Sequence, residues 1–429
     1  MKPWHLVHLQ RMLRDQWKSP EELADIQNAK LRQLIRHAHA RVPVYRRLFD
    51  EAGIRPSDIQ TVDDLPRIPI MSRRTLHESP LEDRLARGVE PDRCRQSATS
   101  GTTGIPLKLH VTPRDATLKS LTWARAFLSR GMRPWDRMVA FIGQEHVRTA
   151  SSWYERVGLW RRREVSTWAG PEAWVHEIRQ WRPRALVGYV MTLRLLADHL
   201  LRAGIDDVTP SLVFHSSAVL DDVSRRFLEG TLRTRIVDIY GSDEAGCIAW
   251  ECGACRGYHV SSDVLVVELL RNGNRVSPGE EGEVIITNLH AYAMPFIRYA
   301  QGDVARMSTE PSACGRGLPL LERIEGRTDD FLVLRGGKMI SPHPVYHCID
   351  HVPGIARWKA VQHAVDQLTV YIELERRHEP AAIHGAVRRN LQALLGPEVA
   401  LTVETVECLP VDPSAKFRVV TSTVGAVLT

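Results

Sequence analysis

The chain has 429 residues, which suits two to three domains at roughly 150 residues each; 43% of the residues are hydrophobic and 25% are charged. These fractions are typical of a globular protein and exclude a disordered chain, a collagen and a low-complexity scaffold. The formal net charge of +6 favours polyanionic ligands such as nucleotides or CoA, but no compact basic run points to nucleic acid.

Cysteine count and hydropathy indicate the compartment. Seven cysteines are an odd number, which does not suit a closed disulfide framework. The stretch Met1 to Leu13 has no apolar core of the signal-peptide kind, and no apolar run is long enough to span a bilayer. We therefore expect a cytoplasmic protein with no membrane partner.

The N-terminal segment is predicted to be helical. Apolar residues recur at helical spacing over residues 20–50, and Ser19-Pro20-Glu21-Glu22 is a helix start signal. Val42-Pro43 breaks the pattern. Prolines at 56, 66, 69 and 80 then predict an ordered connector with short turns over residues 53–80.

Residues 95–300 alternate between strand-like and helical stretches, which predicts an α/β domain with a largely parallel sheet. Ligands of such sheets bind beyond the carboxyl ends of the strands. The predicted strands are Met138–Ile142, Ala185–Val187, Leu212–Phe214 and Arg235–Ile239, and the predicted helices are 113–130, 171–181, 190–203 and 221–231.

After about residue 264 the alternation of strands and helices gives way to other patterns. Val264–Leu270 and Val284–Thr287, separated by a turn at Asn272-Gly273-Asn274, predict an antiparallel β subdomain. After residue 330 a small α+β unit is expected, with strands near 331–334, 357–363, 368–374 and 400–406 and a helix near 380–395.

A loop rich in glycine and hydroxyl side chains runs from Thr99 to Pro106. Its glycines let the backbone approach an anion closely, and its N–H and hydroxyl groups can surround phosphate oxygens. It is not a Walker A motif, because no Gly-Lys-Ser/Thr follows, and for this stretch alone a polar surface loop stays an alternative. The candidate phosphate-binding residues are Ser100, Gly101, Thr102, Thr103 and Gly104.

Four further motifs follow in order: Tyr240-Gly241-Ser242-Asp243-Glu244, Arg298 to Asp303, Gly326 to Asp330, and Pro413-Ser414-Ala415-Lys416. With the loop, they resemble the adenylate-forming acyl-CoA synthetase superfamily. The pattern Val42-Pro43-Val44-Tyr45 followed by Leu65-Pro66 is similar to its phenylacetate–CoA ligase branch. The resemblance covers essentially the whole chain.

The resemblance implies the fold and its domains. An α/β adenylate-forming fold is expected, with a large N-terminal domain of mostly parallel sheets and a β subdomain, and a small α+β C-terminal domain. The N-terminal adenylation domain would be residues 1–328, made of a helical segment 1–90, an α/β core 91–260 and a β subdomain 261–328. Residues 329–429 would form a mobile C-terminal domain, with Asp329 as the hinge.

The resemblance also implies a chemistry. Such enzymes join a carboxylate to the α-phosphate of ATP, release pyrophosphate, and pass the acyl group to a thiol, so donors and cations must offset charge developing at phosphorus. Mg²⁺ would bind at Glu244. Asp303 would accept hydrogen bonds from both ribose hydroxyls, Arg327 would lie near the ribose and phosphate, and Lys416 would lie between the carboxylate and the α-phosphate.

The remaining nucleotide contacts follow in the same way. Tyr240 would lie against adenine, and Gly337 would let a pantetheine arm approach the backbone, with an ordinary hairpin turn as the alternative. Taken singly, Tyr240 could also be a core tyrosine, Asp303 a turn cap, Arg327 a surface cation and Lys416 a solvated lysine. The other predicted nucleotide-binding residues are Ser216, Ser217, Ala218, Gly241, Ser242 and Asp243.

Three positions depart from the family pattern. Asp243 stands where Thr or Ser usually precedes the glutamate, and a second carboxylate there could assist Mg²⁺ or repel the phosphate. Ile105 stands where many members have Lys, and Ala415 stands where Gly often precedes the lysine.

Cys252-Gly253-Ala254-Cys255, with His259 four residues on, has the spacing of a zinc site, whose role would be structural. A fourth ligand is needed, and Cys314 is the choice because the branch often has a cysteine before its Gly-Arg; Cys247 is the competitor. A redox Cys-x-x-C pair is the alternative, but such pairs sit at a helix start beside a parallel strand.

The leading hypothesis is an ATP-dependent carboxylate–CoA ligase acting on an aryl or arylacetic acid, with ATP, Mg²⁺, CoA and Zn²⁺. A second hypothesis transfers the acyl group to a carrier-protein thiol or an amine, as related enzymes do in natural-product and capsule pathways. A third, a zinc-containing nucleic-acid-binding module, lacks clustered cations with exposed aromatics. A homodimer is compatible with the sequence, which leaves the oligomeric state open.

Overall fold

The computed structural model describes residues 3–98, 107–143, 152–216, 219–254, 256–327, 331–340, 342–350, 352–374, 379–409 and 419–424. The chain divides into two compact units, each built from two stretches of sequence. The first unit holds Met1–Pro134 and Val237–Arg323, and the second holds Trp135–Ile236 and Ile324–Thr429. Within the described residues, no helix is both long enough and apolar enough to cross a membrane.

The predicted helical N-terminus is confirmed and begins as the sequence indicates. Ser19 caps α2 through a capping box with Glu22, and Pro20 takes the first helical position. The helix ends before Val42, and Pro43 starts α3. Helix α1 lies within the helical segment 1–90 that the resemblance implies, although no helical periodicity marked it. The helices of this segment are α1 (Pro3–Asp15), α2 (Pro20–Arg41), α3 (Pro43–Glu51), α4 (Arg73–Glu78), α5 (Leu81–Arg84) and α6 (Pro113–Ser129).

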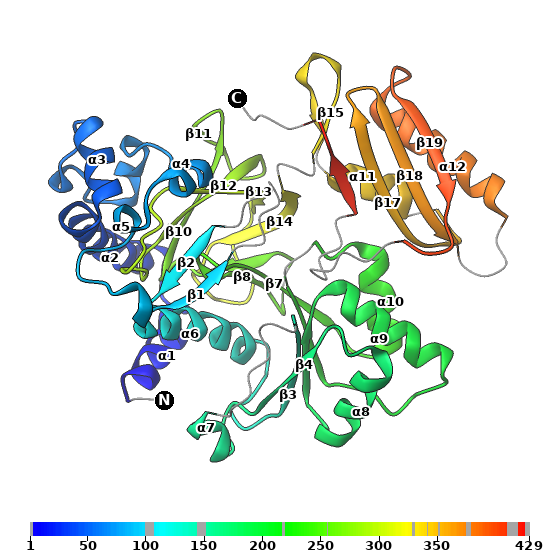
Figure 1. The fold of residues 1–429 in the computed structure, drawn as a ribbon, viewed down its shortest axis with the longest axis horizontal. Coiled ribbons are helices and arrows are strands. Elements are labelled where there is room, and N and C mark those ends of the chain that lie inside the picture. The colour runs from blue at the N-terminus through cyan, green and yellow to red at the C-terminus, as the bar shows by residue number, and fades with distance from the viewer. Residues whose placement is uncertain are drawn as a thin grey trace. The chain divides into compact units, whose positions relative to one another are not determined.

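Most strands of the first unit form one mainly antiparallel run, and all of them except β9 are labelled in Figure 1. Their order is β11-β10-β12-β13-β14-β9-β8-β7, and the pairs are antiparallel from β10 to β13 and from β14 to β7. A separate hairpin joins β1 (Arg95–Ala98) to β2 (Lys108–Val111). The other bounds are β7 (Ile236–Ser242), β8 (Gly246–Glu251), β9 (Tyr258–Val260), β10 (Leu265–Arg271), β11 (Asn274–Arg275), β12 (Glu281–Asn288), β13 (Tyr299–Met307) and β14 (Leu320–Arg327).

The second unit contains the predicted parallel sheet, in the order β6-β5-β3-β4. Strands β3, β5 and β6 are short, largely buried apolar runs, which is why the sequence revealed them. The fourth strand, β4, is mostly polar and was not predicted. The elements are β3 (Met138–Ile142), α7 (Trp153–Arg156), β4 (Arg162–Ser166), α8 (Pro171–Trp181), β5 (Ala185–Gly188), α9 (Val190–Arg202), β6 (Leu212–Ser216) and α10 (Asp222–Leu232).

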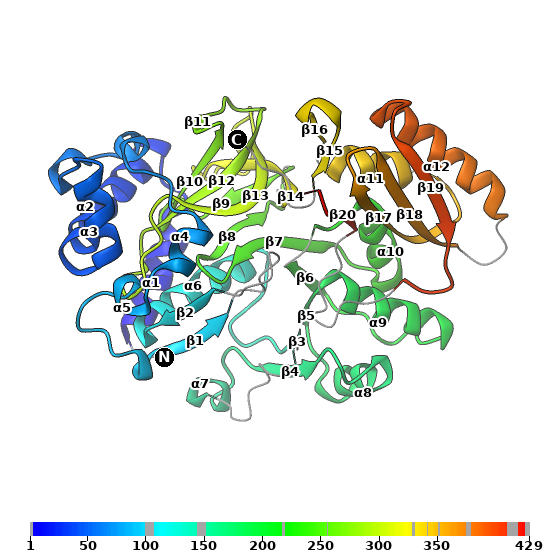
Figure 2. The ribbon, with the colours of Figure 1, turned by 45° about the horizontal axis from the view of Figure 1, so that its top comes forward.

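The C-terminal part of the second unit is the expected α+β structure. A four-stranded sheet in the order β19-β18-β17-β20 packs its apolar residues against α11 and α12, which lie side by side along it (Figure 2). The elements are β15 (Leu332–Val333), β16 (Met339–Ile340), α11 (Pro342–Asp350), β17 (Ile355–Ala364), β18 (Gln367–Leu374), α12 (Pro380–Leu395), β19 (Ala400–Thr405) and β20 (Val420–Ser422).

Candidate active site

Tyr240 and Asp303 meet on two strands of the first unit. The Tyr240 hydroxyl donates to Asp303 Oδ2 at 2.6 Å and accepts from Gln301 Nε2 at 3.2 Å. Asp303 stands in an irregular part of β13, where the register with β12 shifts and Gly302 takes a φ of 76°. Such bulges re-aim side chains next to functional sites. Two residues predicted separately from the sequence therefore share one hydrogen bond.

Glu244 lies in the turn between β7 and β8 and is held from two sides. Its backbone oxygen accepts from Asn288 Nδ2 at 2.9 Å, and its carboxylate accepts from the Tyr299 hydroxyl at 3.3 Å. Burial, together with the charge of Asp243, raises the pKa of the Glu244 carboxyl. A half-buried carboxylate with a raised pKa gains from a nearby cation, which favours its ionised form.

Asp243 has a cationic neighbour that the sequence did not suggest. Lys119 Nζ, from α6, donates to the Asp243 backbone oxygen at 2.6 Å and lies 3.4 Å from its Oδ1. This cation partly offsets the second carboxylate of the motif. Lys119 was missed because it is distant in sequence and carries no motif of its own.

Gly241 and Ser242 shape the same turn. A Cβ at Gly241 would lie 2.7 Å from both the backbone oxygen of Gly246 and the ring of Trp123, so only glycine fits. Ser242 Oγ accepts from the backbone N–H of Ala245 at 3.2 Å. Both residues therefore have structural roles in the described chain, whatever they do with a nucleotide.

A pocket opens beside this turn. Asp115 and Lys119 of α6, Asp243, Glu244 and Asn288 line it. Apolar side chains complete it, namely those of Leu109, Met294 and Phe296. The pocket combines three carboxyl groups and one ammonium group with an apolar wall.

The other predicted nucleotide-site residues belong to the second unit or lie outside the described residues. Ser216 ends β6 and half-buried Arg327 ends β14, both in the second unit. Gly337, at a φ of 77°, forms the turn of the β15–β16 hairpin, as the structural alternative expected. Outside the described residues lie Ser100, Gly101, Thr102, Thr103, Gly104, Ser217, Ala218, Asp329 and Lys416, as well as Ile105 and Ala415.

A second cluster brings together three residues of the predicted metal-ligand set. Cys252, His259 and Cys314 place their ligand atoms within 4.8 Å of one another, and Cys314 Sγ lies 3.3 Å from His259 Nε2. Cys247 is not in this cluster, and Cys255 lies outside the described residues.

The electrostatics of the cluster suit a cation. Burial lowers the pKa of His259 to about 4, which keeps the imidazole neutral. Burial alone would raise the pKa of Cys314, but hydrogen bonds from Ser312 and Arg316 lower it to about 7. A neutral imidazole and an ionisable thiol are the forms that bind zinc.

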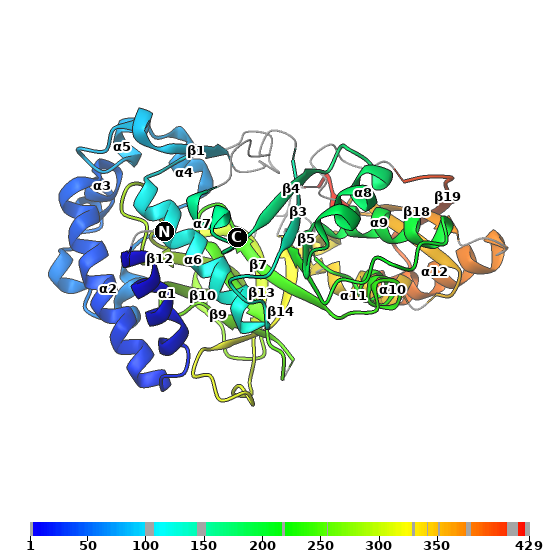
Figure 3. The same cartoon turned by 90° about the horizontal axis from the view of Figure 1, so that it is seen from below.

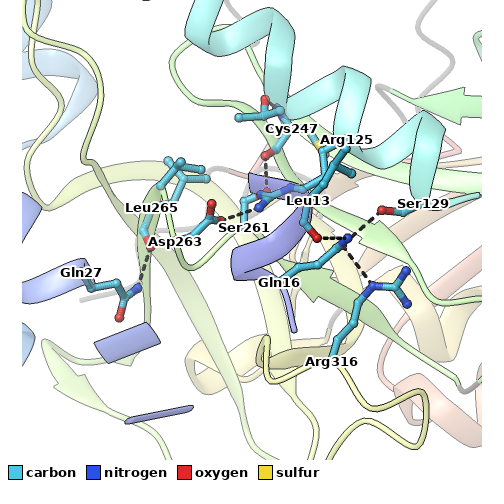
Figure 4. A network of polar contacts seen from close by, with 12 residues as sticks. Leu13, Gln16, Gln27, Arg125, Ser129, Cys247, Ser261, Asp263, Leu265 and Arg316 are labelled. Carbon is cyan, nitrogen blue, oxygen red and sulfur yellow. Dashed lines mark hydrogen bonds and ion pairs between the residues drawn. The ribbon is translucent and has the colours of Figure 1, made fainter. Parts of the chain in front are cut away.

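Figure 4 shows the polar network that ties this region to the N-terminal helices. Gln16, just after α1, accepts through Oε1 from Ser129 Oγ at 3.2 Å and from Arg316 Nε at 3.1 Å. Arg125 of α6 pairs with Asp263 at 2.6 Å, and both side chains are almost fully buried. The loop that carries Cys314 is therefore joined to both α1 and α6.

Comparisons with known proteins agree with this description, although a scan against models of protein families finds no match. The chain is 29% identical to the phenylacetate–coenzyme A ligase of Thermus thermophilus over 327 residues, 74% of this chain and 73% of that one. It is 28% identical to the enzyme of the same name from Aromatoleum evansii over 372 residues, 83% of this chain and 82% of that one.

Solved structures give the same picture for the fold. A 2-hydroxyisobutyryl-CoA ligase bound to an acyl-AMP superposes with a TM-score of 0.80 at 21% identity, covering 95% of this chain and 91% of that one. The predicted adenylate-forming α/β fold is thus confirmed. The chain is a relative of the phenylacetate–coenzyme A ligases and has the fold of adenylate-forming CoA ligases.

Proposed function

We propose that this protein is an ATP-dependent acid–CoA ligase that works through an acyl-adenylate. The observation that carries the proposal is the joined pair Tyr240–Asp303 beside Glu244, in a fold shared with CoA ligases. A carboxylate oxygen attacks the α-phosphorus of ATP and pyrophosphate leaves. The thiolate of CoA then attacks the acyl carbon, and AMP leaves with the oxygen that linked it.

The described residues would bind and orient the nucleotide. Asp303, fixed by Tyr240, is placed to accept hydrogen bonds from vicinal hydroxyls, as a ribose presents them. Glu244 offers an oxygen ligand to Mg²⁺, which would neutralise phosphate charge. Lys119 keeps the Asp243 carboxylate partly compensated, so that it repels an incoming phosphate less. The roles of Arg327, Lys416, the loop 99–106 and a hinge at Asp329 belong to the same proposal.

The acid substrate is proposed from the relatives, which are named for phenylacetate. An aryl or arylacetic acid suits the family, and CoA is the proposed acceptor. A carrier-protein thiol or an amine stays a second candidate for the acceptor.

The test has two stages. ATP–pyrophosphate exchange is measured with aryl, arylacetic and short-chain acids, and the best acid is then offered CoA, a holo-carrier protein and amines in parallel. We expect exchange with an aryl or arylacetic acid and an acyl-CoA product. Absence of exchange with every acid would overturn the enzyme assignment, and a product formed only with a carrier or an amine would overturn CoA as the acceptor.

We also propose that Cys252, His259 and Cys314 hold a zinc ion, with Cys255 as fourth ligand. The convergence of the three ligand atoms supports this proposal. Metal analysis of protein purified without a histidine tag should give about one equivalent of zinc, and Cys314→Ser should lose it. Cys348→Ser, at a half-buried cysteine of α11, is the matched control and should keep the metal. Less than half an equivalent in the wild-type protein would contradict the proposal.

A further inference from the structure

The first unit has a second pocket, which shares the lining residue His290 with the pocket of the candidate active site. Three helices supply its walls, α1, α2 and α6, of which α1 and α6 lie side by side (Figure 3). Basic groups from each helix line it: Arg11 from α1, Lys30 from α2 and Arg114 from α6. The remaining lining residues are His8, Met12, Asp15, Gln33, Leu118, Asp263, Val264, Leu289, His290 and Tyr292.

The acidic residues of this pocket are already engaged. Asp263 is paired with Arg125 at 2.6 Å, and both side chains are almost fully buried. The buried Asp15 carboxylate lies 3.3 Å from Arg14, whose side chain points largely to solvent. The charges of both carboxylates still act on Lys30, but among the described residues neither forms an ion pair with Arg11, Lys30 or Arg114.

The basic groups themselves lack anionic partners. Among the described residues, Lys30, Arg11 and Arg114 have no carboxylate oxygen within 4.0 Å, and the two arginine side chains make no hydrogen bond. Lys30 Nζ donates once, to the backbone oxygen of Asp263 at 2.5 Å, which leaves two of its N–H groups for a ligand. Burial lowers the pKa of the Lys30 ammonium, so an anion at this place would offset its desolvation.

We propose that this pocket binds a compact anion with two or more negative charges, of the phosphate class. Three cations from three helices can surround such an anion, and the two arginines can each donate in pairs to its oxygens. Gln33 adds an amide donor at the rim. The site shares His290 with the candidate active-site pocket, and the segment 288–292 also carries Asn288, which holds Glu244.

The experiment is calorimetric titration of inorganic phosphate into the full-length protein at constant ionic strength. Because Arg11 and Arg114 have no hydrogen-bond or ion-pair partner among the described residues, Arg11→Gln/Arg114→Gln removes two cations without breaking a contact within that part of the chain. The matched control is Arg36→Gln/Arg388→Gln, which removes the same charge from exposed helix positions outside the pocket. A parallel titration uses protein saturated with ATP, which occupies any catalytic phosphate site.

We expect one phosphate per chain, bound at least tenfold more weakly by the pocket variant and with unchanged affinity by the control and by the ATP-saturated protein. The inference is overturned if the wild-type protein shows no saturable binding, or if both double variants lose affinity alike. It is also overturned if ATP removes the phosphate binding, since the anion would then occupy the catalytic site. Only the titration with ATP rests on the proposed function, because it needs a protein that binds ATP; the other outcomes do not depend on the ligase reaction.

Discussion

Replacing Tyr240 by phenylalanine removes one hydroxyl and keeps the ring. That hydroxyl is the donor to Asp303 at 2.6 Å, and without it the carboxylate is no longer fixed from the side of β7. A hydrogen bond to a charged group contributes about 1.5–3 kcal/mol. Because both side chains are only half-buried, we take the lower end, about 1.5 kcal/mol, which corresponds to slightly more than a tenfold change in affinity.

The assay is ATP–pyrophosphate exchange at varied ATP concentration. Tyr240→Phe should raise KM for ATP about tenfold and leave kcat nearly unchanged, since the lost interaction positions the nucleotide in ground state and transition state alike. Asp303→Asn should raise KM at least as much. The double variant should bind ATP no more weakly than Asp303→Asn, because the hydroxyl acts through the carboxylate.

A matched control is available in the same unit. The Tyr258 hydroxyl donates to Asp238 Oδ2 at 2.9 Å, away from the pocket residues, so Tyr258→Phe makes the same chemical change elsewhere. It should leave KM for ATP unchanged. The reasoning is refuted if the effects of Tyr240→Phe and Asp303→Asn simply add, or if Tyr258→Phe raises KM equally.

Three further predictions follow from single contacts. Arg125→Met leaves the buried Asp263 carboxylate without its cation and should lower the free energy of unfolding in urea by about 3–5 kcal/mol. A variant as stable as the wild-type protein would contradict this. Gly317→Ala would place a Cβ 1.9 Å from a backbone oxygen and should cost about 1–3 kcal/mol, whereas Gly230→Ala in α10, with open space around it, should not lower the melting temperature. Burial and the charge of Asp243 raise the pKa of Glu244, so its ionised form is lost at a higher pH than for an ordinary glutamate as pH falls. Asp243→Thr should therefore move the acid limb of the exchange activity to lower pH, and an unmoved limb would show that Glu244 does not control it.

Sequence patterns predicted the elements whose signals are local. The strands Met138–Ile142 and Leu212–Ser216 are short apolar runs bounded by turn residues, and the start of α2 follows from one capping box. Helix α1 was missed because histidines and arginines interrupt its apolar face. Cys252 and His259 are close in sequence, so their meeting could be predicted from spacing.

The contacts of the site that the sequence did not predict depend on strand register. The Tyr299–Glu244 and Tyr240–Asp303 bonds join positions more than fifty residues apart, and the shift in β13 that turns Asp303 toward Tyr240 has no signal beyond Gly302. The position of Lys119 beside Asp243 and the basic pocket also have no signal in the sequence. Their residues come together only when segments far apart in the chain pack against one another.

The discontinuous first unit has a consequence for synthesis on the ribosome. Its two stretches are separated by residues 135–236, and the Arg125–Asp263 pair joins them. At ~5–20 residues per second, the nascent helices α1–α6 wait roughly 10–40 s before Arg323 is made. We therefore expect the N-terminal stretch to engage chaperones during translation, and chains that terminate before β14 to be degraded.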